Sequence, residues 1–124
     1  IAGGTGITPM IQIIRAVLRN ENDSTKLSLL FANKEEKDII LRDKLENPNI
    51  DFSDRFKVHY TLDKVNDEWS GFKGFINEDM IRDTMPKPGN DTLILLCGPP
   101  KMNSEAVKPA LESIGYLPES IFNF

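Results

Sequence analysis

Two short segments of this chain combine residue types that could bind a nucleotide. They are Gly3-Gly4-Thr5-Gly6-Ile7-Thr8-Pro9-Met10, near the start, and Cys97-Gly98-Pro99-Pro100-Lys101-Met102, which follows an apolar run. Glycines let a phosphate approach the backbone closely, and the N-terminus of a following helix attracts negative charge. In an open α/β sheet such turns lie at the carboxyl ends of strands, where ligands bind. Together they predict a dinucleotide pocket.

The first turn can also be interpreted as a tight strand-to-helix connection without a ligand. Its pattern is not a regular dinucleotide fingerprint, because Pro9 stands where the third glycine belongs, and no Gly-Lys-Ser/Thr follows to make a phosphate-binding P-loop. The second predicted strand ends in Phe31-Ala32-Asn33-Lys34, without the carboxylate that usually holds the adenosine ribose. Asp63, which ends the third strand, is either that carboxylate or a solvated turn residue, and spacing leaves both interpretations open.

Cys97 has three interpretations: a nucleophile, a contact at the site of hydride transfer, or a core residue. A nucleophile needs a neighbouring base, but the only histidine, His59, lies within another predicted strand. The rigid Gly98-Pro99-Pro100 exit favours a contact at the hydride site, because it lets another ring system approach the strand end. Three aromatic residues, Phe31, Phe75 and Phe124, are by default core residues.

The elements expected to position these residues alternate between strands and helices. A helix over residues 9–20, with Thr8 as N-cap and Pro9 first, precedes a strand over 26–32, a short helix over 38–45 that Asn47-Pro48 stops, and a strand over 56–62. Asn77 then caps a further helix. A buried strand over 92–97, a helix over 101–113 that is either broken by or kinked at Pro109, and an edge strand over 121–124 follow. This order predicts a three-layer Rossmann-like α/β domain: a mainly parallel sheet of five to six strands with helices on both faces.

Bulk properties narrow the function classes. The 124 residues suit one domain, residues 1–124, and no apolar run approaches the ~20 residues of a spanning helix. A net charge of −4 with scattered basic residues makes nucleic acid an unexpected partner. One cysteine and one histidine leave no metal ligand set and favour a reducing compartment. Because Ile1-Ala2 resembles the end of a strand, we expect the first strand to be truncated and the chain to be a piece of a longer polypeptide.

The motifs, taken in order, resemble the NADH-binding half of the cytochrome b5 reductase branch of the ferredoxin–NADP reductase superfamily. The resemblance covers essentially the whole chain through IAGGTGITPM at 1–10, LLFANKEEKDIILR at 29–42, YTLD at 60–63, Trp69, Gly74-Phe75, LCGPPKM at 96–102 and Phe124. Lys101 replaces the family's usual third proline. The family's Arg-x-Tyr-Thr flavin-binding segment belongs to an N-terminal β-barrel, and nothing in this chain matches it.

The resemblance implies a role for each motif. The first turn would line the pyrophosphate and face the flavin, Asp63 and Phe75 would hold the adenosine half, and Cys97 with Gly98 and Pro99 would orient the nicotinamide without acting as a nucleophile. Phe124 would lie near the domain interface. The full set of expected cofactor-binding residues is Gly3, Gly4, Thr5, Gly6, Ile7, Thr8, Pro9, Phe31, Asp63, Phe75, Cys97, Gly98, Pro99, Pro100, Met102 and Phe124.

The expected function is the NADH-binding domain of an oxidoreductase that passes hydride from NADH to FAD and single electrons to a haem protein such as cytochrome b5. FAD would be held mainly by another domain of the same polypeptide, and the fragment alone would be inactive. The enzyme would be intracellular and face the cytosol, and any membrane anchor would precede residue 1. No basic cluster accompanies Asp63, so NADH is expected over NADPH. The alternatives are the flavin module of a nitrate reductase, a non-catalytic regulatory nucleotide-binding domain and a Cys97 thiol enzyme.

Overall fold

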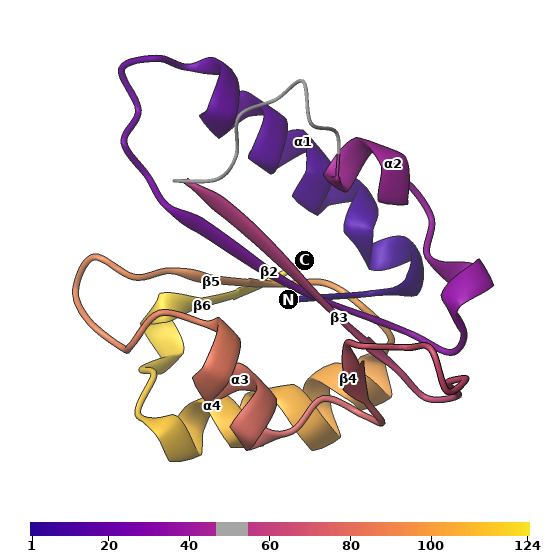
Figure 1. Ribbon diagram of the computed structural model, residues 1–124. Coiled ribbons are helices and arrows are strands. Elements are labelled where there is room, and N and C mark those ends of the chain that lie inside the picture. Colours follow the sequence, from indigo (N-terminus) through magenta and orange to yellow (C-terminus); the bar gives the residue numbers. More distant parts are fainter. Residues whose placement is uncertain (47–54) are drawn as a thin grey trace.

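The computed structural model describes residues 1–46 and 55–124, and within them six strands form two parallel sheets (Figure 1). The larger sheet has the order β1 (Ala2–Gly3), β2 (Leu27–Asn33), β3 (Phe56–Leu62) and β4 (Phe72–Lys73), and the smaller pairs β5 (Ile94–Leu96) with β6 (Ile121–Asn123). A single backbone bridge between Ala2 and Cys97 joins β1 to β5. The predicted fold class, a mainly parallel α/β domain, is confirmed. The strands divide into sheets of four and two, fewer in each sheet than the predicted five to six, because a single bridge rather than a ladder connects β1 to β5.

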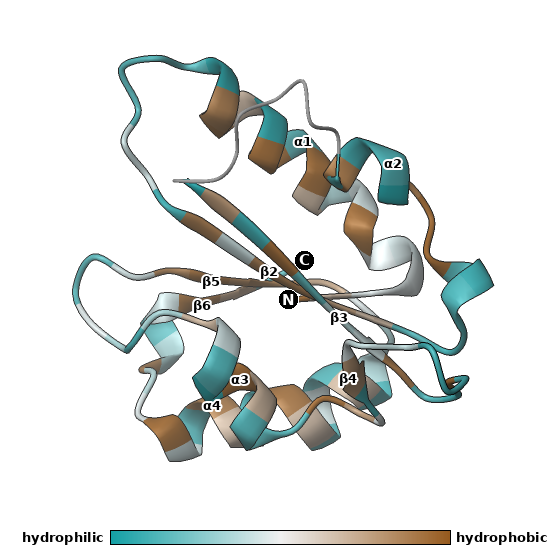
Figure 2. Ribbon diagram, in the orientation of Figure 1, coloured by the Kyte–Doolittle hydropathy of each residue, from teal (hydrophilic) through white to brown (hydrophobic). Residues whose placement is uncertain are grey.

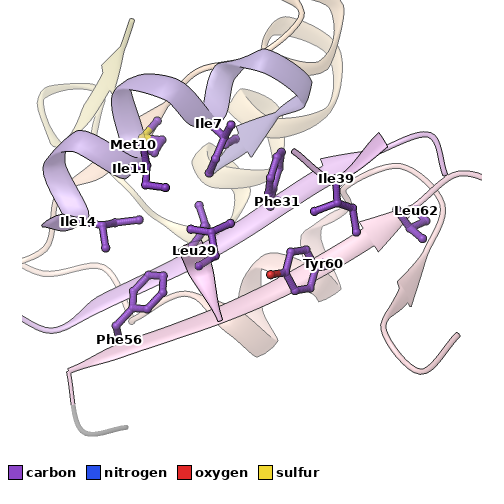
Figure 3. Packing of buried hydrophobic residues seen from close by; sticks show 12 residues of the cluster. Ile7, Met10, Ile11, Ile14, Leu29, Phe31, Ile39, Phe56, Tyr60 and Leu62 are labelled. Atoms are coloured by element: carbon purple, nitrogen blue, oxygen red, sulfur yellow. The ribbon is translucent and has the colours of Figure 1, made fainter. Parts of the chain in front are cut away.

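Helices cover both sheet faces, as predicted (Figure 1). One face carries α1 (Ile7–Arg19), the 3-10 turn η2 (Glu36–Asp38) and α2 (Arg42–Leu45); the other carries α3 (Glu78–Thr84), the π-helical turn η3 (Met102–Val107) and α4 (Lys108–Ile114), and a last 3-10 turn, η4 (Pro118–Ser120), leads into β6. In α1, apolar residues at positions 7, 10, 11 and 14 form one stripe. Figure 2 shows this alternation of apolar and polar residues along α1, and Figure 3 shows the stripe packed against β2 and β3.

The first helix begins earlier than predicted. A 3-10 turn, η1 (Gly4–Gly6), runs directly into α1, because the Ile7 N–H donates to the carbonyl oxygens of Gly4 and Thr5. Gly6 is therefore the N-cap, no side chain caps the helix, and Thr8 lies inside the first turn. The prediction that Thr8 is the N-cap is wrong, and Pro9 is the third helical residue.

The predicted helix over 38–45 is divided into η2 and α2. Glu35 and Asp38 form a reciprocal capping box at the start of η2, which ends at Asp38 itself. Leu41 then takes a left-handed conformation with φ of 59° before α2 begins. The predicted stop at Asn47-Pro48 lies outside the described residues. The chain also forms β4, a two-residue strand that sequence reasoning missed because so short a strand carries no periodicity.

Other local predictions are confirmed. The Asn77 side chain accepts a hydrogen bond of 2.9 Å from the Met80 N–H at the start of α3. The predicted helix over 101–113 is divided into η3, which is irregular, and α4, which follows it directly. Pro109, which lacks the N–H that a regular α-helix uses, is the second residue of α4.

Within the described ranges, no helix is long and apolar enough to cross a membrane.

Candidate nucleotide-binding site

The two glycine-containing turns meet directly. The Gly3 N–H donates to the Cys97 carbonyl oxygen at 3.0 Å, and the Cys97 N–H donates to the Ile1 carbonyl oxygen at 3.1 Å. A Cβ atom at Gly6 would lie 2.2 Å from the Cys97 oxygen, and a Cβ atom at Gly98 would lie 2.5 Å from Cε of Met102. The absence of side chains at these positions therefore allows the two strand ends to touch.

A cavity of about 760 Å³ opens beside this junction. That volume falls within the range typical of small-ligand and cofactor sites. Residues from the ends of β1, β2 and β3, from the segments after β4 and β5, and from η2 line it: Gly3, Gly4, Thr5, Ala32, Asn33, Lys34, Asp38, Ile40, Asp63, Phe75, Ile76, Pro99, Lys101, Met102, Glu105 and Ala106. The cavity therefore lies at the carboxyl edge of the parallel strands, where the sequence predicted it.

The first turn leaves room for a phosphate. Gly4 has φ of +54°, a conformation that favours glycine, and a Cβ atom at this position would meet nothing within 4 Å. The Gly6 N-cap supplies no side chain to the first N–H groups of α1, and no acidic residue lies in the first turn of that helix. The positive end of the α1 dipole is thus uncompensated beside a glycine turn that lines the cavity, which suits an anion.

Backbone and side-chain hydrogen bonds position Asp63 and Phe75. The Thr61 hydroxyl donates to the Gly74 carbonyl oxygen at 2.6 Å, and the Gly74 N–H donates to the Leu62 carbonyl oxygen at 2.7 Å. These bonds hold the segment after β4 against the end of β3, so that Asp63 and Phe75 line one cavity. Phe75 is 76% exposed, and its uncovered ring can stack on a flat base.

Asn33 offers a further polar group. Its Nδ2 is buried and has no hydrogen-bond partner among the described residues, while the residue lines the cavity at the end of β2. A buried amide without a partner is costly, and a ligand hydroxyl or phosphate in the cavity could accept its hydrogen bond. The unobstructed space beside Gly4 suits a phosphate, and the Asn33 amide suits a hydroxyl or phosphate oxygen, so both groups fit a dinucleotide.

Seven of the predicted residues line the cavity: Gly3, Gly4, Thr5, Asp63, Phe75, Pro99 and Met102. The others do not line it: Gly6, Ile7, Thr8, Pro9, Phe31, Cys97, Gly98, Pro100 and Phe124. Phe31 is completely buried in the core, with its ring centroid 6.3 Å from that of Tyr60. Phe124 is half-exposed; its N–H donates to the Leu96 carbonyl oxygen at 2.9 Å, and its ring packs edge-on against Phe122.

Sequence reasoning missed several lining residues as candidates: Ala32, Asn33, Lys34, Asp38, Ile40, Ile76, Lys101, Glu105 and Ala106. Asn33 and Lys34 could have been found from their place at the end of a predicted strand. Asp38 and Ile40 carry no such signal, because they lie at the end of η2 and just after it rather than at a strand end. Lys34 also places one basic group beside Asp63; the sequence analysis had noted only that no basic cluster accompanies this residue.

Comparison with known proteins identifies the class of this chain. The family model described as the oxidoreductase NAD-binding domain matches residues 1–108. The chain belongs to this family of NAD-binding domains.

Individual relatives show which members of this family the chain resembles. NADH-cytochrome b5 reductase 3 of Rattus norvegicus is 56% identical over 124 residues, and NADH-cytochrome b5 reductase 1 of Homo sapiens is 51% identical over the same length; the chain spans 41% of each. The cytochrome b5 reductase domain of Ulva prolifera nitrate reductase superposes with a TM-score of 0.95 at 41% identity, over 99% of this chain and 46% of the other. The CS-b5R domains of human Ncb5or in the NAD⁺ form superpose with a TM-score of 0.82 at 32% identity, over 99% and 35%. The predicted resemblance to the cytochrome b5 reductase branch is confirmed, and the chain spans less than half of these relatives.

Proposed function

We propose that the chain is the NADH-binding domain of an FAD-dependent oxidoreductase and that it binds NADH in the cavity described above. The observation that carries this proposal is the convergence of the glycine turn, Asp63, Phe75 and the Pro99 turn on one cavity. Together these four features provide a position for a phosphate, a carboxylate, an aromatic ring and a second turn whose backbone a ligand can approach closely. A dinucleotide-binding site uses groups of these kinds.

Each part of the site has a role in this proposal. The open face at Gly4 and the N-terminus of α1 hold the pyrophosphate. Asp63 accepts hydrogen bonds from the adenosine ribose hydroxyls, and Phe75 stacks on the adenine. The Cys97-Gly98-Pro99 turn orients the nicotinamide. Cys97 forms no covalent bond in this proposal; the single histidine of the sequence, His59, lies on β3, whereas Cys97 directly follows β5.

The bound cofactors would supply the chemistry: a hydride would pass from NADH to FAD, and the two electrons would then leave singly to a haem protein such as cytochrome b5. The contribution of this chain is orientation. Holding one reactant in a fixed geometry removes much of the entropic barrier of a reaction between two molecules. FAD would be held mainly by another domain of the same polypeptide, and the enzyme would face the cytosol.

A second candidate is the same role within a nitrate reductase-type flavin module. The superposition with the Ulva prolifera domain favours it, since that domain matches this fold at a TM-score of 0.95. The two candidates share the NADH site and differ only in the electron acceptor. Reduction of purified cytochrome b5 by the complete polypeptide, compared with reduction of nitrate, separates them.

The proposal is tested by mixing the chain with NADH and FAD. The expected result is measurable binding of NADH or ADP-ribose, without rapid bleaching of added FAD in stopped-flow absorbance, because free flavin lacks a fixed position. Failure to bind either ligand contradicts the nucleotide site. Flavin bleaching at the rate of an intact reductase contradicts the division of roles between this chain and a separate flavin domain.

A further inference from the structure

Two oppositely charged residues follow neighbouring strands at the cavity. Lys34 comes directly after β2 and Asp63 directly after β3. The Asp63 N–H donates to the Asn33 carbonyl oxygen at 3.2 Å, and the Lys64 N–H donates to the Lys34 carbonyl oxygen at 2.8 Å. Backbone pairing thus continues past the ends of both strands and holds Lys34 and Asp63 side by side in the cavity wall.

The Lys34 ammonium is available to a ligand. Lys34 is exposed, and it takes part in none of the ion pairs found among the described residues. Two basic residues that follow it along the chain are engaged in ion pairs: Lys37 pairs with Glu35 at 3.1 Å, and Arg42 pairs with Glu36 at 2.8 Å.

The other charged groups that line the cavity come from different elements. Asp38 lies in η2 and accepts a hydrogen bond from the Glu35 N–H at 3.1 Å. Lys101 and Glu105 follow β5, in the turn that leads into α4. Of the described lining residues, Lys34 is the one basic group at the ends of β2 and β3.

We propose that Lys34 is a specificity-determining residue that lets this site accept a dinucleotide with a phosphate on the adenosine ribose in addition to the unphosphorylated form. This inference rests on the proposed function. A carboxylate accepts hydrogen bonds from ribose hydroxyls and repels a 2′-phosphate, whereas a lysine ammonium attracts that phosphate as a point charge. Because the two residues lie side by side, the attraction of Lys34 for the 2′-phosphate offsets the repulsion of that phosphate by Asp63.

The test compares binding of ADP-ribose and of its 2′-phosphorylated form by isothermal titration calorimetry. The substitution Lys34→Gln removes the charge and keeps most of the side-chain length. It is expected to weaken binding of the phosphorylated ligand about tenfold and to leave ADP-ribose binding unchanged, which also shows that the variant folds. Lys64→Gln is the matched control, because Lys64 is exposed, lies next to Asp63 and does not line the cavity. For this variant, the ratio of the affinities for the phosphorylated ligand and for ADP-ribose is expected to match that of the unmodified protein.

The reverse substitution gives a second measurement. Asp63→Asn is expected to strengthen binding of the phosphorylated ligand, and this gain is expected to shrink when Lys34→Gln is added. The inference is overturned if Lys34→Gln weakens both ligands equally or neither, or if Lys64→Gln changes the ratio as much. In those cases ADP-ribose still binds and the proposed function stands. If the unmodified protein binds neither ligand, the proposed function and this inference both fail.

Discussion

Replacing Gly6 by alanine tests the contact between the two turns. Gly6 has φ of −63°, which alanine adopts freely, so the substitution carries no backbone strain. Its Cβ would lie 2.2 Å from the oxygen and 2.6 Å from the carbon of the Cys97 carbonyl, and ordinary contact begins at 3.4 Å. Because both atoms belong to backbone, the turns must separate by about 1 Å. Overpacking of this kind costs about 3 kcal/mol, near the upper end of the usual range.

Thermal unfolding measures this cost. For a chain of 124 residues, 3 kcal/mol corresponds to a decrease in Tm on the order of 10 °C. The control is Gly4→Ala, which meets no atom within 4 Å but places alanine at φ of +54°, so it is expected to cost only about 1 kcal/mol. Gly6→Ala is also expected to weaken ADP-ribose binding, since the same junction borders the cavity. A Tm for Gly6→Ala equal to or above that of Gly4→Ala would refute the argument.

Four further outcomes are expected. In the complete enzyme, Asp63→Ala narrows the preference for NADH over NADPH by about 1 kcal/mol, and an unchanged ratio of kcat/KM values contradicts its assignment to the ribose. Cys97→Ser slows flavin reduction in stopped-flow measurements but leaves turnover, whereas complete loss with flavin still bound favours a nucleophile. Arg42→Gln removes two ion pairs and the stacking of its guanidinium over Trp69, so urea unfolding is expected to show a loss of about 1 kcal/mol with a change in Trp69 fluorescence. Burial lowers the pKa of His59 below 6.5, so near that pH the unfolded state binds more protons than the folded state, and the free energy of unfolding decreases as the pH falls through that value. In urea titrations, His59→Gln should flatten the dependence of the free energy of unfolding on pH between about pH 7.5 and about pH 5.5.

Local signals in the sequence were sufficient where one segment determines its own structure. The apolar spacing of α1 predicted the helix, and Asn77 predicted the start of α3, because both effects act within a few residues. The Thr8 cap failed for a related reason. The Gly4-Thr5-Gly6 segment forms a 3-10 turn that extends the helix towards the N-terminus, and nothing in the sequence ranked that turn against a threonine cap.

The sequence by itself determined that this chain carries glycine turns at strand ends, an α/β alternation and a resemblance to cytochrome b5 reductases. Only the tertiary structure decided which strand ends are neighbours. The parallel pairing of β2 with β3 places Lys34 beside Asp63, and the Ala2–Cys97 bridge brings the two turns into contact. It also decided that Phe31 is buried in the core while Phe75 faces the cavity. Contacts between residues far apart in sequence depend on strand order and register, which residue types at one position do not encode.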